Sequence, residues 1–313
     1  MKSEYCSFEA LVSPYDLKKP VDWSKQFNRC APTDVEIGFG MGETLMRMAQ
    51  ESPDRNFIGI EQHWERICKT LRVMTKERST APGAFENVRV LRVDARVVFE
   101  RLFAPKSIDT VYCLFPCPWP KKGHIKHRLF NNNFLRLLNN RLKKGGQINI
   151  VTDFYPYFEW VLSEAKGAGL RAETTTVGPQ YGTKFERKWQ DEGQEEFFKL
   201  ELFKTRHVES PVKKDVVLKS YALNKFDFDC LQLKDEKGKA SIIFKDTVFD
   251  RDKQKAMIHV LVAEGHLTQH FWVTVTKKTK AWRIARADGQ NFFPTPGIAK
   301  ALELVYEAAK TAH

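Results

Sequence analysis

A regular alternation of short apolar runs with amphipathic stretches, between residues 35 and 152, constrains the fold more than any other feature of this chain. After the first run, Leu45, Met48 and Ala49 lie at helical spacing, and similar stretches separate the later runs. Strands that alternate with helices in this way predict a mostly parallel sheet with helices on both faces, which is an α/β fold. The runs of strand length are VEIGFG, NFIGIE, NVRVLRVD, SIDTVYCLF and QINIVTD.

The pattern changes near residue 210. A helix over 158–170 and the strand pair RAETTTV and EFFKLELFK complete a first domain, which we place at residues 1–208. Residues 206–215 are polar and contain Pro211, which is typical of a linker. Residues 211–313 predict a second, smaller α+β domain, an antiparallel sheet with one helix over 297–312. Its strand-like runs cover residues 215–223, 226–234, 239–249, 257–265, 270–278 and 281–288.

Composition excludes several classes of protein. No apolar run reaches the roughly 20 residues of a membrane span, and the N-terminus lacks the pattern of a signal peptide, so we expect a soluble cytoplasmic protein with no membrane contact. The six cysteines are scattered without a Cys-x-x-Cys pair, which predicts neither a metal site nor a disulfide framework. The net charge of +12 favours a polyanionic partner.

Three glycines, Gly38, Gly40 and Gly42, follow the first predicted strand. Glycines allow a sharp turn and let a ligand approach the main chain, and the helix start behind them exposes amide groups. Glu36 lies directly before these glycines. A carboxylate there opposes a pyrophosphate but suits an ammonium group, which favours S-adenosylmethionine over a nicotinamide cofactor.

Two more acids end the next two strands. Glu61 lies 21 residues after Gly40, where a Rossmann-like site holds the acid that accepts hydrogen bonds from a ribose. Asp94 ends the third strand, where we expect it to accept a hydrogen bond from an adenine amino group. The carboxyl ends of parallel strands meet at one edge of a sheet, so Glu36, Glu61 and Asp94 together predict a ligand crevice.

The loop after the fourth strand, FPCPWPKKGH, contains three prolines that stiffen it and Trp119, which offers a surface for base stacking. Stiff backbone, one aromatic ring and a basic cluster are typical of a nucleic-acid site. The plainer alternative is a surface loop that caps a helix. The cluster consists of Lys121, Lys122, His124, Lys126, His127 and Arg128.

The sequence resembles the bacterial tRNA (guanine-N7)-methyltransferases. The resemblance covers about residues 34–204 through the segments EIGFGMGETL, NFIGIE, LFPCPWPKKGHIKHRL, VTDF and GTKFE, in that family's order. It implies a class I methyltransferase fold and methyl transfer from S-adenosylmethionine to N7 of a guanine in the tRNA variable loop. The core family lacks a counterpart of residues 211–313, for which added RNA contact and fold stability are both open.

The resemblance also implies roles for individual residues. Cys117 and Asp153 occupy the positions expected to be catalytic. The cofactor-binding positions are Glu36, Gly38, Gly40, Glu61, Asp94 and Cys117. The substrate-binding positions are Lys121, Asp153, Thr183, Lys184, Phe185 and Glu186.

One position departs from the family pattern, which has aspartate where this chain has Cys117. A thiol does not replace a carboxylate as an acceptor and is mostly uncharged at pH 7. N7 of guanine has a free lone pair and no proton, so its attack on the sulfonium methyl needs no general base. We therefore expect activity to survive with Cys117, and Asp153 or Glu186 to accept hydrogen bonds from the Watson–Crick edge of the guanine.

Two other interpretations stay open. In the first, Cys117 makes the chain a catalytically weak or silent paralogue that binds tRNA, although a silent protein has no need of Glu36, Glu61 and Asp94. In the second, the same fold methylates a small molecule, which the basic loop and net charge disfavour. We expect a monomer or a homodimer.

Overall fold

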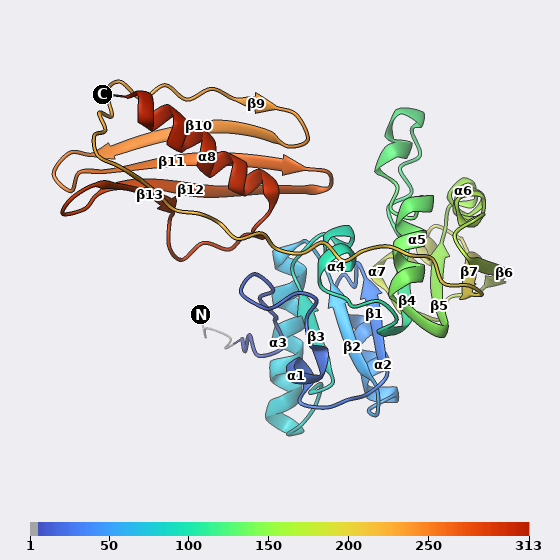
Figure 1. Ribbon diagram of the computed structural model, residues 1–313. Coiled ribbons are helices and arrows are strands. Elements are labelled where there is room, and N and C mark those ends of the chain that lie inside the picture. The colour runs from blue at the N-terminus through green and yellow to red at the C-terminus, as the bar shows by residue number, and fades with distance from the viewer. Residues whose placement is uncertain (1–5, 313) are drawn as a thin grey trace. The chain divides into compact units, whose positions relative to one another are not determined.

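The computed structural model describes residues 6–312, apart from the side chains of Lys184 and Phe185. It divides into two compact units, of which the first ends at Lys213 and the second begins at Lys214. Each unit has its own sheet and its own hydrophobic core. Figure 1 colours the first unit from blue to yellow and the second in orange and red.

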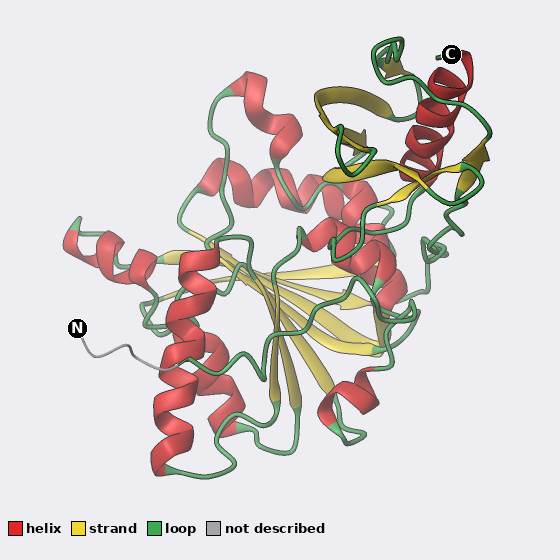
Figure 2. Ribbon diagram, turned by 90° about the vertical axis from the view of Figure 1, so that its left-hand side faces the viewer, coloured by secondary structure: helices red, strands yellow, loops and turns green. Residues whose placement is uncertain are grey.

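The N-terminal unit is built on a seven-stranded sheet with the strand order β3-β2-β1-β4-β5-β7-β6. Neighbouring strands among β1 to β5 are parallel, whereas β7 is antiparallel to both β5 and β6. Figure 2 shows the strong twist of this sheet and the helices on either side of it. The strands are β1 Thr33–Ile37, β2 Asn56–Ile60, β3 Val88–Leu91, β4 Ile108–Leu114, β5 Leu142–Thr152, β6 Leu170–Val177 and β7 Phe197–Lys204.

The centre of this sheet is buried because helices cover both of its faces. Strands β1 and β2 are buried at every residue, as expected of parallel strands with no solvent-facing side. The predicted α/β architecture is therefore confirmed. The helices are α1 Trp23–Phe27, α2 Glu43–Glu51, α3 Trp64–Thr80, α4 Ala95–Arg101, the 3-10 helix η1 Lys122–His127, α5 Asn132–Arg141, α6 Tyr155–Ala165 and α7 Lys184–Asp191.

Helix α5 ends earlier than the sequence pattern indicates, since 132–146 reads as one helix stopped by a glycine pair. The helix ends at Arg141, and β5 begins at Leu142. Gly146 instead lies inside β5, where a Cβ atom would come within 2.8 Å of the Asp109 carbonyl oxygen. The glycine is needed for close approach between neighbouring strands and does not stop the helix.

A buried polar cluster at the end of α5 holds the segment that leads to the second unit. Asn139 donates to the carbonyls of Gly169 and Arg206, and Asn140 donates to the carbonyl of Val208. The fully buried Arg141 guanidinium donates to the carbonyls of Phe99 at 2.8 Å and Ser210 at 2.9 Å. Burial lowers the pKa of Arg141 to about 10. Residues 205–211 are therefore fixed to the first unit by side chains that replace water for their backbone.

Replacing Arg141 by methionine should destabilise the N-terminal unit by about 3 kcal/mol, because several buried acceptors lose their only donor. Thermal unfolding followed by circular dichroism, with hydrogen exchange at residues 205–211, measures the effect. Arg136→Met is the matched control, since Arg136 is exposed on the same helix and, among the described residues, donates only to the Gly167 carbonyl at 3.2 Å. Equal melting of the two variants would show that the buried cluster contributes nothing to stability.

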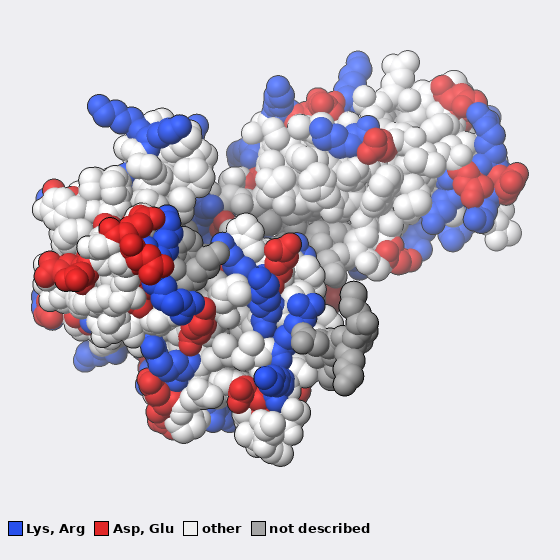
Figure 3. Space-filling model, turned by 180° about the vertical axis from the view of Figure 1, so that it is seen from behind, with Lys and Arg blue, Asp and Glu red and all other residues white. Residues whose placement is uncertain are grey.

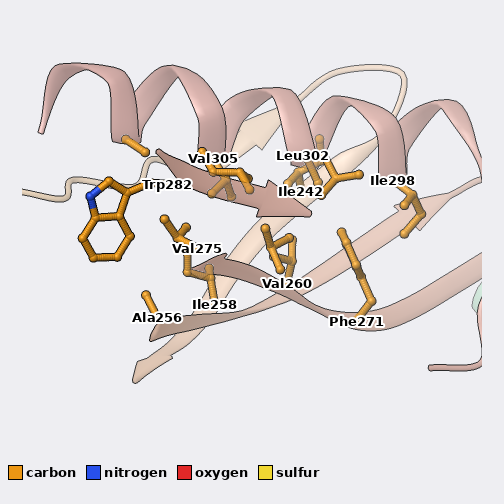
Figure 4. Packing of buried hydrophobic residues seen from close by; sticks show 14 of the residues in the cluster. Ile242, Ala256, Ile258, Val260, Phe271, Val275, Trp282, Ile298, Leu302 and Val305 are labelled. Carbon is orange, nitrogen blue, oxygen red and sulfur yellow. The ribbon is translucent and has the colours of Figure 1, made fainter. Parts of the chain in front are cut away.

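The C-terminal unit is a six-stranded antiparallel sheet with the order β8-β13-β12-β11-β10-β9, covered on one face by helix α8. Figure 4 shows Ile298, Leu302 and Val305 of α8 above the apolar side chains of the sheet. The predicted antiparallel sheet with one helix is confirmed. The elements are β8 Tyr221–Leu223, β9 Glu236–Lys237, β10 Ser241–Asp250, β11 Lys255–Glu264, β12 Leu267–Lys277, β13 Trp282–Arg286 and α8 Pro296–Thr311.

Two predicted strands of this unit are wrong or too long. Of residues 215–223, only the last three pair with the sheet, and residues 226–234 form no strand. The alternating aromatics of the second run are anchors for a loop. Phe226 packs edge-on against Trp282 at 5.1 Å, and Phe228 stacks on Phe249 at 4.7 Å. The alternation of apolar and polar residues in this run therefore reflects side chains that pack against the sheet, although the backbone does not pair with a strand.

Candidate functional site

The three predicted acids lie at the ends of three neighbouring strands of the sheet. Strands β3, β2 and β1 are neighbours, and Asp94, Glu61 and Glu36 lie at or just beyond their carboxyl ends. Strand β4 is the other neighbour of β1, so the chain reverses its direction of progress across the sheet between β1 and β4. Crevices of parallel α/β sheets form at such a point, at the carboxyl ends of the strands. Figure 1 shows β1 and β4 side by side.

The glycine turn between β1 and α2 is open above its backbone. Gly38 and Gly40 have backbone φ angles of 73° and 59°, which residues other than glycine rarely adopt. A Cβ atom built on Gly38 would meet nothing within 4 Å, and one on Gly40 only the Gly38 carbonyl oxygen at 3.9 Å. The turn is thus held by the Gly38 amide, which donates to the Ile60 carbonyl at 2.7 Å, and leaves room for a ligand against the main chain.

Glu36 is a buried carboxylic acid with an unused acceptor. It is 3% exposed, and its Oε2 atom is buried without a hydrogen-bond partner in the described part of the chain. Burial, reinforced by the negative charge of Glu43, raises the pKa of Glu36 to about 8. A buried acid without a donor costs free energy unless a ligand supplies one. The residue is therefore built to receive a cationic or donor group.

Glu61 is already saturated with hydrogen bonds. Its Oε1 accepts from the amides of Gln62 at 2.8 Å and His63 at 3.0 Å, and its Oε2 from Gly40 at 3.2 Å and from Arg66 Nη1 at 3.3 Å. A carboxylate offers about four acceptor sites. A ribose hydroxyl would therefore have to displace one donor, and the half-exposed Arg66 holds the longest of the four bonds.

Asp94 is also fully engaged. It caps α4 by accepting from the Arg96 amide at 2.8 Å, and it accepts from the Arg96 guanidinium and from Gln62 Nε2 at 3.0 Å. Burial favours protonation of Asp94, but the bonds from Arg96 and Gln62 outweigh it and lower the pKa. Of the three predicted acids, Glu36 is the one with spare capacity. Gln62, Arg66 and Arg96 carried no sequence signal, because side chains that neutralise a site acid have no fixed spacing.

Two buried side chains hold the loop after β4, residues 115–128, in place. Phe115 and Trp119 have φ angles of 53° and 44°, which is strained for aromatic residues. Phe115 is buried against Phe197 at 5.1 Å. Arg128, which the sequence groups with the basic cluster, is buried: its Nε donates to the Pro118 carbonyl at 2.8 Å, and its guanidinium lies 5.1 Å from the Trp160 ring. Arg128 is thus a brace for the loop and not a surface cation.

Most of the polar residues in this loop are exposed. Cys117 and Lys121 are exposed, and η1 carries the exposed Lys122, His124, Lys126 and His127. Trp119 is half-buried and packs against His127 at 5.3 Å and His124 at 5.7 Å. The loop therefore presents a thiol, an indole and a set of cations on a backbone fixed by Phe115 and Arg128.

Asp153 directly follows β5, the neighbour of β4. It is half-buried, and its carboxylate accepts no hydrogen bond from another residue of the described chain. Burial raises the pKa of Asp153, and the charge of Lys188 opposes this only in part. The Phe115 amide donates to the Val151 carbonyl at 2.8 Å, which ties the loop after β4 to the strand that ends at Asp153.

Glu186 has a structural role in this arrangement. It is 1% exposed, and its carboxylate accepts from the amides of Gln180 at 2.6 Å, Tyr181 at 3.0 Å and Gly182. Thr183 caps α7 by accepting from the Glu186 amide at 3.1 Å. These two residues shape the loop before α7. The side chains of Lys184 and Phe185, both expected to bind substrate, lie outside the described residues.

The loop before α7 lies against the glycine turn, although about 140 residues separate them in sequence. Thr44 Oγ1 donates to the Tyr181 carbonyl at 3.3 Å, and Arg187 pairs with Glu43 at 3.2 Å. The structure thus brings the predicted cofactor half, on β1 to β3, next to the predicted substrate half, on β4, β5 and α7. Sequence reasoning missed the Glu43–Arg187 pair, which only the tertiary structure reveals.

The residues present fit S-adenosylmethionine on two observations. The orphaned Glu36 carboxylate suits the α-ammonium, and the open glycine turn leaves space for a ligand with no phosphate. A separate cleft of about 450 Å³ is bordered by Trp23, Thr33 and Asn56. It lies at the amino ends of β1 and β2, opposite to the ends that carry the acids. Within residues 6–312, no group of three or more His, Cys, Asp or Glu side chains is placed to hold a metal, and no helix is both long and apolar enough to cross a membrane.

Comparison with known proteins agrees with this geometry. A family model described as "Putative methyltransferase" matches residues 30–199. A tRNA (guanine-N(7)-)-methyltransferase of Chlorobium phaeobacteroides is 43% identical over 177 residues, which cover 56% of this chain and 84% of that protein. One of Thermotoga maritima is 28% identical over 321 residues, 95% of this chain and 97% of its own length, so the similarity extends through the C-terminal unit.

Among solved structures, an antibiotic-related methyltransferase superposes with a TM-score of 0.47 at 18% identity, over 58% of this chain and 92% of that chain. The match of the family model to more than half of the chain, together with the identity to the Chlorobium protein, shows that this chain belongs to the tRNA (guanine-N7)-methyltransferase family.

Proposed function

We propose that this protein transfers the methyl group of S-adenosylmethionine to N7 of a guanine in the variable loop of tRNA. The observation that carries the proposal is the Glu36 carboxylate, whose Oε2 has no partner among the described residues. It lies beside an open glycine turn, on the strand next to β4, which leads into the loop of residues 115–128. The substrate side rests on the relatives, which are named for guanine N7 methylation of tRNA. We also propose a cytoplasmic location and a monomer or homodimer.

The chain's own residues supply binding and alignment. Glu36 accepts hydrogen bonds from the ammonium of S-adenosylmethionine, and Glu61 binds its ribose after giving up a donor. When bound, the cofactor supplies an electrophilic methyl on its sulfonium. The braced loop and Asp153 hold the guanine so that nitrogen, carbon and sulfur lie in line, which is where most of the rate acceleration of such a transfer arises.

Asp153 is the acceptor for the Watson–Crick edge of the guanine. Glu186 is the weaker candidate, because three backbone amides already occupy its carboxylate. Positive charge spreads into the purine as N7 is alkylated, and the acidity of N1 and N2 rises with it. A carboxylate that accepts from those atoms therefore binds the transition state more tightly than the ground state.

Nucleoside mass spectrometry tests the proposal. Unmodified tRNA incubated with the protein and S-adenosylmethionine should accumulate 7-methylguanosine, and sequencing of the product should place it in the variable loop. Small-molecule nucleosides should not be methylated under the same conditions. Absence of 7-methylguanosine, with S-adenosylmethionine still bound, would leave the silent tRNA-binding paralogue as the function.

Cys117 is the observation that favours this second candidate, and a substitution separates the two. The wild-type protein should methylate tRNA at a measurable rate, and Cys117→Asp should raise that rate by no more than about tenfold, because the added carboxylate stabilises charge without acting as an obligatory base. Initial rates with saturating tRNA measure this. Cys230→Asp, at another exposed cysteine, is the control and should change nothing. A wild-type protein as inactive as buffer, rescued by Cys117→Asp, would contradict the prediction.

A further inference from the structure

The positive charge of the C-terminal unit is concentrated at one end of its sheet. Residues 214–313 contain seventeen Lys and Arg and twelve Asp and Glu. Seven of these basic residues and two of the acids lie in two turns, 250–255 and 277–283, which we call the basic end. The rest of the unit has ten of each sign, so the whole excess charge of this unit lies at the basic end.

The two turns are neighbours in space. Turn 250–255 joins β10 to β11, turn 277–283 leads from β12 into β13, and the Lys277 amide donates to the Gln254 carbonyl at 3.0 Å. Lys255 lies opposite Thr276, which lies opposite Arg283, so these side chains form one row across three strands. Both turns are at the left end of this unit in Figure 1, and Figure 3, seen from behind, shows basic side chains at its right end with acidic ones among them.

Five cations of the basic end have no carboxylate partner within residues 6–312, and one of them, Lys277, lies over the Trp282 ring at 5.2 Å. Arg251 pairs with Asp229 at 2.9 Å and Lys253 with Asp250 at 3.3 Å. Lys278, Lys280 and Arg283 are exposed, and Lys255 is half-exposed. A cluster of unpaired like charges weakens the folded state through self-repulsion, and it attracts a polyanion that releases its counterions on binding. Besides Lys277, the unpaired cations of the basic end are Lys255, Lys278, Lys280 and Arg283.

An aromatic pair lies on the adjoining face of the sheet, opposite α8. His259 lies across from Trp272 in the register of β11 and β12, and their rings stack at 4.8 Å with an interplanar angle of 19°. His259 is four residues from Lys255 along β11, about 13 Å in a strand. No helix described in the C-terminal unit covers this face: Val248 is 59% exposed, and His270 is exposed. Half-exposed rings beside a phosphate-binding edge are the usual means of holding a nucleotide.

We propose that the basic end and the His259–Trp272 ring pair form a second tRNA contact surface, remote in sequence from the methyl-transfer site. The unpaired cations bind backbone phosphates, and the ring pair packs against a ribose or an unpaired base. The identification of the polyanion as tRNA rests on the proposed function. The C-terminal unit then contributes affinity for the body of the substrate and not to the chemistry.

The test is tRNA binding by the full chain without S-adenosylmethionine, measured by fluorescence anisotropy over a range of salt concentrations. Lys278→Gln/Lys280→Gln/Arg283→Gln should weaken binding at 0.15 M salt at least tenfold and should lower the slope of log affinity against log salt by about 2. The matched control is Lys234→Gln/Lys237→Gln/Lys239→Gln, which removes the same charge from exposed positions near β9. It should retain both the affinity and the slope.

The ring pair has its own signature. Trp272→Leu should lower the affinity about tenfold and leave the salt slope unchanged, because a stacking contact releases no counterions. An unchanged affinity would remove the ring pair from the surface. Far-UV circular dichroism and thermal unfolding should be the same in all variants, which shows that each is folded.

Three results would overturn the inference: an unchanged slope in the first triple variant, an equal loss in the control, or a loss of binding to vesicles rich in phosphatidylserine with tRNA binding intact. Its failure is distinguishable from that of the proposed function. Formation of 7-methylguanosine with no change in slope rejects the second surface alone. A changed slope in a protein that makes no 7-methylguanosine rejects the methyl transfer alone.

Discussion

Replacing Glu36 by glutamine is expected to weaken the binding of S-adenosylmethionine about 100-fold, because a buried charge-assisted contact to the ammonium is lost. The same substitution should stabilise the ligand-free protein above neutral pH. Both effects follow from one observation, a 3% exposed carboxyl group whose Oε2 has no partner among the described residues. The site is maintained at the expense of stability, which is common where a protein must bind a charged ligand.

The pH dependence has a defined sign. Burial raises the pKa of Glu36 from the ordinary 4.5 to about 8, so between those values the folded chain holds a proton that the unfolded chain has lost. Stability therefore falls as the pH rises through this window, by up to about 1.4 kcal/mol per unit from this group, and levels off above pH 8. The glutamine variant lacks this loss, so its advantage should be small near pH 5 and about 4 kcal/mol at pH 8.

Thermal melting at pH 5 and pH 8 measures the stability effect, and titration calorimetry measures binding. In the wild type, binding below pH 8 should release a proton, visible as a dependence of the enthalpy on the buffer. Asp34→Asn is the contrasting control: Asp34 is equally buried in β1 but accepts two bonds of 2.7 Å from Arg55, so its loss should destabilise the protein at both pH values. A glutamine variant that binds the cofactor normally would remove Glu36 from the site.

Asp153→Asn is expected to lower kcat/KM for tRNA about 100-fold while leaving the affinity for S-adenosylmethionine unchanged. The amide keeps the size of the side chain but loses the negative charge that balances the developing positive charge of the purine. Because the Asp153 carboxylate accepts no bond from another described residue, the substitution breaks no internal side-chain contact and the protein should fold normally.

Single-turnover methylation rates with saturating cofactor measure this effect. Asp191→Asn, at an exposed position in α7, is the control and should behave as wild type. If the loss appears in KM alone, Asp153 binds the guanine equally in the ground and transition states. If Asp153→Asn is fully active while Glu186→Gln is folded and inactive, the acceptor is Glu186.

The N-terminal sheet could be predicted from the sequence because its signals are local. A buried parallel strand is a short apolar run, and a covering helix has apolar residues at helical spacing, so the alternation from residue 35 onward is enough. The candidate cofactor acids could be predicted for the same reason. Glu36 and Glu61 lie at or next to strand ends, and a parallel sheet places all such ends at one edge.

The wrong predictions share a physical cause. Residues 226–234 alternate like a strand, yet Phe226 and Phe228 anchor a loop to the sheet. Arg128 belongs to a basic run, yet it is buried, donates to the Pro118 carbonyl and lies against the Trp160 ring. In each case the side chain found its partner in a segment far along the chain, and no local pattern records such a contact.

The sequence by itself determined the α/β architecture, the family and the position of the glycine turn, because each depends on neighbouring residues. Only the tertiary structure decided which of the three acids keeps an acceptor available for a ligand. Glu61 and Asp94 are saturated by Arg66, Arg96 and backbone amides, whereas Glu36 is buried with no donor to Oε2 from any described residue. The tertiary structure likewise brought turns 250–255 and 277–283 together into one charged surface. Hydrogen-bond saturation and charge density depend on distances in space, which residue spacing along the chain does not fix.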